Sequence, residues 1–361
     1  MASIHRFSHI YLLLIVLLAL LPIPTFAALP YKGADISSVL MLENQGRTFS
    51  DTSGTVKPFE QILAEAGANS IRQRVWVDPE DGNYNLDYNV ELARRVSEAG
   101  MGVYLDLHYS DTWADPAHQT TPAAWSSYNI GDLKWAVYNY TLDVCNRFAS
   151  ENIPVSIISI GNEIRAGLLW PLGSADSYYN IADILHSASA GVKDSALSPQ
   201  PQIMIHLDNA WNWDQQSYWY DTVLAQGPLI ASDFDMMGVS YYPFYNEGAT
   251  MQALEDTMTR MGEAYGKPIL VVETDWPVAC PNPTYQFPED IKDIPFSVEG
   301  QRAFVKEVAA VVERVEYGQG LYYWEPGFLG NAGLGSSCED NLMVSDDTGR
   351  AYESLLVFGG I

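Results

Sequence analysis

The chain has 361 residues, of which 47% are hydrophobic, so it can build a sizeable core and is not a disordered protein. Its 45 acidic residues outnumber its 19 basic ones, and the formal net charge is −26. Nucleic acids and anionic membranes are bound through Lys and Arg that neutralise phosphates, so this charge argues against both as partners. Three cysteines are too few for a disulfide-dense scaffold.

The first 27 residues have the organisation of a secretory signal peptide. Arg6 precedes an uninterrupted apolar run over residues 11–21, and the segment ends on small residues at Ala27. The run is about half as long as the ~20 residues that a membrane-spanning helix needs, which disfavours an uncleaved anchor. We therefore expect residues 1–27 to be removed and residues 28–361 to form a secreted, extracellular domain without a membrane partner.

Eight short apolar runs predict strands along the mature chain. They cover residues 31–37, 70–76, 102–108, 154–162, 202–208, 234–243, 268–274 and 319–325. Amphipathic segments at helical spacing separate them, and such near-continuous apolar strands are typical of a parallel sheet covered on both faces. Eight alternating units predict an α/β protein with a single (β/α)8 TIM barrel, whose active site lies at the C-terminal ends of the strands. The rival is an open doubly wound sheet, but no glycine-rich phosphate turn follows the first run.

Polar residues that can do chemistry gather at the ends of these runs. The C-terminal ends of barrel strands form one rim, so their side chains should converge there. They are Arg72, Arg74, Asp106, His108, Asn162, Glu163, His206, Asp208, Tyr241, Tyr242, Glu273, Trp324 and Glu325.

Two of these carboxylates, Glu163 and Glu273, follow long apolar runs and are hard to explain as ordinary surface charge. The fourth and seventh strands face each other across an eight-stranded barrel, so the two side chains can meet over its mouth. Retaining glycosidases need one protonated carboxyl and one carboxylate about 5–5.5 Å apart. A structural alternative is that both carboxylates simply pair with Arg72 and Arg74.

Five strings at successive strand ends carry a family resemblance. They are SIRQRVW at 70–76, LDLH at 105–108, DTWADP at 111–116, IGNEIRAG at 160–167 and VSYYPF at 239–244. They resemble glycoside hydrolase family 53, the arabinogalactan endo-β-1,4-galactanases, and the resemblance runs from about Tyr31 to Tyr352. It implies a secreted, retaining endo-β-1,4-galactanase that acts on galactan and arabinogalactan side chains of plant cell-wall pectin.

The resemblance also implies roles for individual residues. Glu163 would be the general acid/base and Glu273 the nucleophile, which Arg72 and Tyr242 would orient and keep ionised. Asn162 would hold the sugar 2-hydroxyl. The subsites around the cleavage point would be lined by His108, Trp113, Asp208 and Trp324.

Cofactor and metal are not expected. Asp106, His108, Asp111, Asp115 and His118 lie close in sequence, but their spacing matches no zinc motif. By the resemblance, a disulfide takes the place of the calcium ion that ties the last two strand-end loops in bacterial members.

The cysteines and one sequon complete the sequence-based expectations. Three cysteines permit three single bridges; outside the cell Cys280 and Cys338 can pair, while Cys145 is expected to be a buried free thiol. Asn139 is in the only N-x-[ST] sequon and is expected to carry a glycan. Trp135, on the same predicted helix, is expected to pack in the core.

Two other functions remain open. Another β-1,4-glycanase of the same clan would cleave mannan or cellulose instead. A non-catalytic polysaccharide-binding barrel would keep the aromatic residues but lose one carboxylate, and both carboxylates are present here. We expect the protein to be a monomer.

Overall fold

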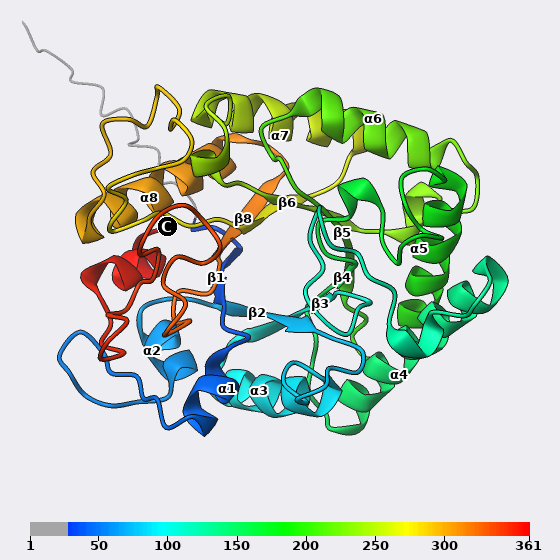
Figure 1. Cartoon of the computed structure of the whole chain (residues 1–361), viewed down its shortest axis with the longest axis horizontal. Coiled ribbons are helices and arrows are strands. Elements are labelled where there is room, and N and C mark those ends of the chain that lie inside the picture. The colour runs from blue at the N-terminus through cyan, green and yellow to red at the C-terminus, as the bar shows by residue number, and fades with distance from the viewer. Residues whose placement is uncertain (1–27) are drawn as a thin grey trace, which may run out of the picture.

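The computed structural model describes residues 28–361, which form a closed barrel of eight parallel strands (Figure 1). The strands follow one another around the barrel in chain order, and β8 closes the sheet by pairing with β1. The predicted (β/α)8 barrel is therefore confirmed. The predicted signal peptide, residues 1–27, lies outside the described residues.

All eight predicted runs contain a strand. The strands are β1 (Tyr31–Asp35), β2 (Ser70–Val75), β3 (Gly102–Leu107), β4 (Ile157–Ile160), β5 (Gln202–Leu207), β6 (Met236–Ser240), β7 (Ile269–Glu273) and β8 (Gly318–Tyr323). Every strand ends one to three residues before the predicted run does, and β8 begins one residue before its run. The residues left over, such as His108, Asn162 and Asp208, turn out of the sheet and build the rim.

The α-helices surround the barrel (Figure 1). They are α1 (Val39–Asn44), α2 (Phe59–Glu65), α3 (Leu86–Glu98), α4 (Ile130–Ser150), α5 (Tyr178–Lys193), α6 (Trp213–Leu224), α7 (Met251–Tyr265) and α8 (Val298–Arg314). Short 3-10 helices include η2 (Ile164–Ala166), directly after the predicted acid/base, and η5 (Glu353–Gly360) at the C-terminus. Helices α3 to α8 each begin on a polar side chain that accepts a hydrogen bond from the first turn, which fixes where the loops end.

The core has two parts, and the smaller one fills the inside of the barrel. Its buried members are Tyr104, Ile157, Met204, Met236, Leu270, Val272 and Tyr322. Two tyrosines meet edge to face there, with 5.3 Å between the ring centroids of Tyr104 and Tyr322. Because the interior is packed, the barrel is not a pore, and ligands can only bind above it, at the rim.

In the described part of the chain, no helix has the length and apolar character needed to cross a membrane.

Candidate active site

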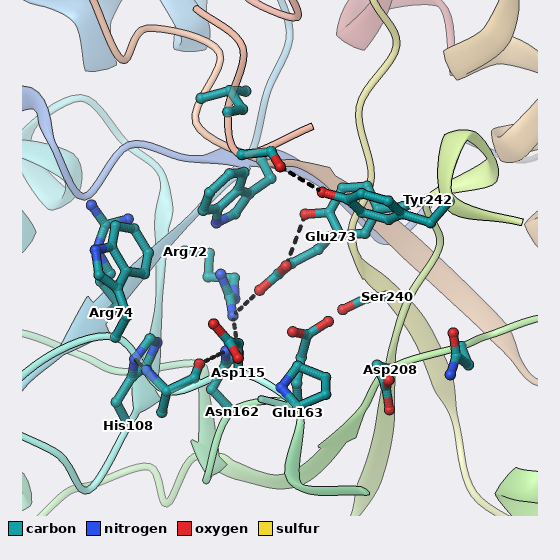
Figure 2. A pocket seen from close by; sticks show the side chains of 18 of the residues that line it. Arg72, Arg74, His108, Asp115, Asn162, Glu163, Asp208, Ser240, Tyr242 and Glu273 are labelled. Carbon is teal, nitrogen blue, oxygen red and sulfur yellow. Dashed lines mark hydrogen bonds and ion pairs between the residues drawn. The ribbon is translucent and has the colours of Figure 1, made fainter. Parts of the chain in front are cut away.

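A cavity of about 500 Å³ opens at the C-terminal rim of the barrel (Figure 2). All nine predicted catalytic, supporting and substrate-binding residues line it, and Ser240, Trp211 and Arg74 lie among them. The loop after β8 adds Asn331, Leu334 and Gly335 to its wall. Residues as far apart in sequence as Arg72 and Gly335 therefore share one site.

Glu273, the last residue of β7, is held by two side chains. Its Oε1 lies 2.7 Å from Nη2 of Arg72, and the Tyr242 hydroxyl donates a hydrogen bond of 2.8 Å to Oε2. Burial raises the pKa of Glu273 to about 7, although Arg72 and Tyr242 both act to lower it. The carboxylate form is thus favoured by Arg72 and Tyr242 and opposed by desolvation and, to a lesser extent, by the nearby Asp106 and Asp35.

Arg72 is buried and serves several strands at once. Its Nη1 lies 2.7 Å from Asp35 at the end of β1, and Nη2 lies 2.9 Å from Asp106 on β3. Nη2 also donates to Oδ1 of Asn162 at 2.8 Å. A cation without water around it needs such partners, and the surrounding carboxylates raise the pKa of Arg72, so it stays charged.

Glu163 enters the cavity from the turn after β4 and has no such partner. Within residues 28–361, no Lys, Arg or His forms an ion pair with it; the nearby Arg165 pairs with Asp208 instead, at 2.8 Å. Burial, followed by the charges of Glu273 and Asp208, raises the pKa of Glu163 well above its ordinary value. Its backbone is left-handed, with φ +48°, which costs a non-glycine residue about 1–3 kcal/mol and is found mainly at functional sites.

The two glutamates face each other across the cavity (Figure 2). Arg72 and Tyr242 favour the charged form of Glu273, whereas the negative Glu273 favours the neutral form of Glu163. When the pair shares one proton, that proton therefore resides on Glu163. The arrangement can deliver a proton from one side of a bound substrate and a nucleophile from the other.

Asn162 and His108 are fixed by the loop after β3. Nδ2 of Asn162 donates to the carbonyl oxygen of Ala114 at 2.7 Å, so its amide cannot rotate freely. Nδ1 of His108 accepts from the backbone N–H of Ala114 at 3.1 Å, while Nε2 lies 3.0 Å from Asp106. Burial lowers the pKa of His108, so the neutral ring carries its proton on Nε2 and donates it to Asp106.

The aromatic side of the cavity is formed by Trp113 and Trp324, with 5.9 Å between their ring centroids in an edge-to-face contact. Behind Trp113 lies Arg74, whose Nη1 pairs with Glu325. The proposed structural alternative is therefore only half present: Arg72 does pair with Glu273, but Arg74 has a different carboxylate.

Sequence reasoning missed several residues of the cavity. Ser240, Trp211 and the contact between Arg165 and Asp208 were not singled out as parts of the site. Ser240 ends β6, as the other rim residues end their strands, so its position was a usable signal. The residues from the loop after β8 carry no comparable signal, because that loop has no regular structure.

The predicted disulfide is present between Cys280 and Cys338, and Cys145 is a buried free thiol. The bridge joins the loop after β7 to the loop after β8, which lines the cavity. Between residues 28 and 361 there is no group of three or more His, Cys, Asp or Glu side chains that could hold a metal ion.

Comparison with known proteins places the chain among glycosidases. The family model described as Glycosyl hydrolase family 53 matches residues 31–358. The chain is 62% identical over 336 residues to the "Probable arabinogalactan endo-beta-1,4-galactanase A" of Neosartorya fischeri, covering 93% of this chain and 94% of the relative. It is 58% identical over 342 residues to the arabinogalactan endo-β-1,4-galactanase A of Aspergillus niger, covering 95% and 98%.

Solved structures agree with these relatives. A solved structure described as "Structure of two fungal beta-1,4-galactanases" superposes on this chain with a TM-score of 0.91 at 58% identity. The match covers 92% of this chain and 100% of that chain. The xylanase 10B of Thermotoga maritima, at 11% identity and a TM-score of 0.61 over 92% and 97% of the two chains, shares the fold alone. With a family model matching nearly all of the described residues and relatives at about 60% identity, the chain belongs to glycosyl hydrolase family 53.

Proposed function

We propose that the protein is a secreted endo-β-1,4-galactanase that hydrolyses galactan and arabinogalactan side chains of pectin with retention of configuration. The observation that carries the reaction class is the pair Glu163 and Glu273, which line one cavity with opposite electrostatic surroundings. The substrate is supported by the names of the relatives, which are galactanases at 58–62% identity.

In the first step, Glu163 gives its proton to the glycosidic oxygen while Glu273 attacks the anomeric carbon. The bond to the leaving sugar breaks, and an ester forms between Glu273 and the remaining galactosyl chain. Arg72 and Tyr242 keep Glu273 ionised and oriented until this moment. Asn162, whose amide is held on both sides, is placed to bind the 2-hydroxyl next to the reacting carbon.

In the second step, Glu163 is the base. Esterified Glu273 has no charge, so it no longer disfavours the ionised form of Glu163. Glu163, which lost its proton in the first step, takes one from water, and the water oxygen attacks the anomeric carbon. Glu273 leaves as a carboxylate, and the product keeps the configuration of the substrate.

Substrate binding is assigned to the aromatic side of the cavity. Tryptophan faces bury the apolar side of a sugar ring, and Trp113 and Trp324 line the cavity next to the reacting pair. We propose that both contact the galactan chain, with Asp208 and His108 on the polar sides. The protein acts as a monomer in this proposal.

The test compares three proteins on linear galactan. Wild type should release short oligomers early, and NMR should show that the first product has the β configuration. Glu163→Gln and Glu273→Gln should each lose at least 10³-fold in kcat on galactan. With an activated 2-fluoro galactoside, Glu163→Gln should still form a covalent adduct detectable by mass spectrometry, and Glu273→Gln should form none.

The outcomes separate the alternatives. Equal trapping by both variants, or a first product of inverted configuration, contradicts the assigned roles. Faster hydrolysis of mannan or cellulose than of galactan would indicate another β-1,4-glycanase. Binding of galactan without turnover by wild type would indicate a non-catalytic barrel.

A further inference from the structure

A buried histidine without a role in the reaction lies behind the acid/base. His206, on β5, is completely buried, and its Nε2 lies 2.8 Å from Oγ of Ser240. Ser240 is the last residue of β6 and lines the cavity. Its hydroxyl faces the Glu163 carboxyl (Figure 2) and acts to lower the pKa of that carboxyl.

The direction of these hydrogen bonds follows from the other nitrogen of His206. Nδ1 has no hydrogen-bond partner among the described residues. A proton on Nδ1 would be a buried donor without an acceptor, which folded proteins avoid more strictly than an unused acceptor. The proton therefore sits on Nε2 and is donated to Oγ of Ser240, which leaves the Ser240 hydrogen free to point at Glu163.

We propose that Ser240, oriented by His206, is a positioning residue for the acid/base Glu163. Its hydroxyl donates to the carboxyl oxygen that does not carry the catalytic proton. The proton is then confined to the other oxygen, which faces the glycosidic bond. The same hydrogen bond stabilises the carboxylate that remains when Glu163 has given its proton away. This inference rests on the proposed role of Glu163.

The Ser240 hydroxyl opposes the effect of the negative charges that surround Glu163. The carboxylates of Glu273, Asp208 and Asp115 act to raise its pKa, whereas the Ser240 hydroxyl acts to lower it. His206 cannot contribute a charge, because burial and the nearby Arg72 lower its pKa to about 3. The ionisable groups that face Glu163 are Glu273, Asp208, Asp115, Arg165, Tyr242 and Tyr245.

The experiment measures kcat, KM and the pH profile of Ser240→Ala on galactan. We expect kcat to fall about tenfold with little change in KM, as for the loss of one hydrogen bond to a charged group. The basic limb of the profile should move to higher pH, because a donor that favours the charged form has been removed. On an aryl galactoside with a good leaving group, which needs no acid in the first step, the loss in kcat/KM, which reports that step, should be small.

Two further variants keep the test decisive. Ser240→Thr retains the hydroxyl and should restore kcat and the pH profile, and Ser240→Cys, with a weak donor of similar shape, should lie between Ala and wild type. Ser70→Ala is the matched control, because Ser70 is also a buried strand serine, whose Oγ accepts from Tyr322 at 2.8 Å. It should keep the pH profile of wild type.

A wild-type kcat and pH profile in Ser240→Ala would overturn the inference, and so would equal losses of kcat/KM on galactan and on the aryl galactoside. Either result leaves the role of Glu163 intact if Glu163→Gln is inactive on galactan. Full galactan hydrolysis by Glu163→Gln would instead overturn the proposed function itself.

Discussion

The guanidinium carbon of Arg74 lies 4.2 Å from the ring centroid of Trp113, on the wall of the cavity. The same guanidinium carbon also lies 4.2 Å from the ring centroid of Tyr84, and Nη1 of Arg74 forms an ion pair with Glu325. A planar cation between two aromatic rings fixes the orientation of both. Trp113 is therefore held in place from behind, and its position depends on a residue that need not touch substrate.

Arg74→Lys keeps the charge for Glu325 but removes the planar group that stacks on Trp113. We expect KM for galactan to rise about fivefold, equivalent to ~1 kcal/mol of binding, with a smaller change in kcat. Trp113→Ala should raise KM more. The double variant should resemble Trp113→Ala alone, because both changes remove the same contact; strictly additive effects in the double-mutant cycle would contradict this coupling.

The buried carboxyl of Asp275 should make the stability of the protein depend on pH. Its side chain is buried, neither carboxyl oxygen has a hydrogen-bond partner in the described chain, and burial together with the Glu273 charge raises its pKa well above the ordinary value. The folded state therefore binds the proton of the Asp275 carboxyl more tightly than the unfolded state does. The stabilisation from this protonation is greatest below the unfolded-state pKa of about 3.9, and it is lost as pH rises through the folded-state pKa.

Asp275→Asn keeps the shape and removes the titration. In wild type, the titration of Asp275 makes the free energy of unfolding decrease as pH rises from 4 to 7. In the variant, the slope of this decrease should be smaller by up to ~1.4 kcal/mol per pH unit, measured by urea unfolding at each pH. The exposed Asp78→Asn is the control and should keep the wild-type slope. An unchanged slope in Asp275→Asn would show that the carboxyl titrates normally in the folded protein.

The disulfide predicts a joint effect on stability and substrate binding. Cys280 and Cys338 are 58 positions apart, and removing a bridge across such a loop costs about 2–4 kcal/mol. The loop after β8 lines the cavity, so Cys280→Ala/Cys338→Ala should lower Tm and raise KM for galactan together. Cys145→Ala, away from this loop, should leave KM unchanged. Wild-type KM in the double variant would show that the loop holds its shape without the bridge.

The expectation that Trp135 packs in the core is wrong: its side chain is 61% exposed on α4. It lies one helical turn before the exposed Asn139, so we expect an N-linked glycan at Asn139 to pack its first sugar on this ring. Protein secreted from a eukaryotic host should lose mass on treatment with an endoglycosidase, and Asn139→Gln should match the treated form. Trp135→Ser should lower Tm only in the glycosylated protein; an equal shift in both forms would contradict the contact.

Most of the fold could be predicted because parallel strands buried on both faces appear in the sequence as apolar runs. The rim followed from the same runs, since Glu163 and Glu273 come where the apolar pattern stops. Trp135 shows where hydrophobicity misled the prediction. It lies about 200° around the helix from Leu133, on the face opposite the buried residues, so helical spacing already placed it outside.

Partner choice among the rim residues could not be predicted. Arg72 and Arg74 lie two residues apart on one face of β2 and both line the site, yet one pairs with Glu273 and the other with Glu325. The hydrogen bond between His206 and Ser240 joins neighbouring strands whose register is set by the closed barrel. Such pairings depend on three-dimensional closure, which no local pattern reports.

The buried charges around Arg72 and Arg74 do not balance in the resting enzyme. Two guanidinium groups are paired with Asp35, Asp106, Glu273 and Glu325, so negative charge is in excess away from water. In the proposed reaction, esterification of Glu273 removes one of these charges. The cluster around the two arginines thus comes closer to neutrality in the covalent intermediate, while the negative charge reappears on Glu163, which forms no ion pair with either arginine, so the total charge of the site stays the same.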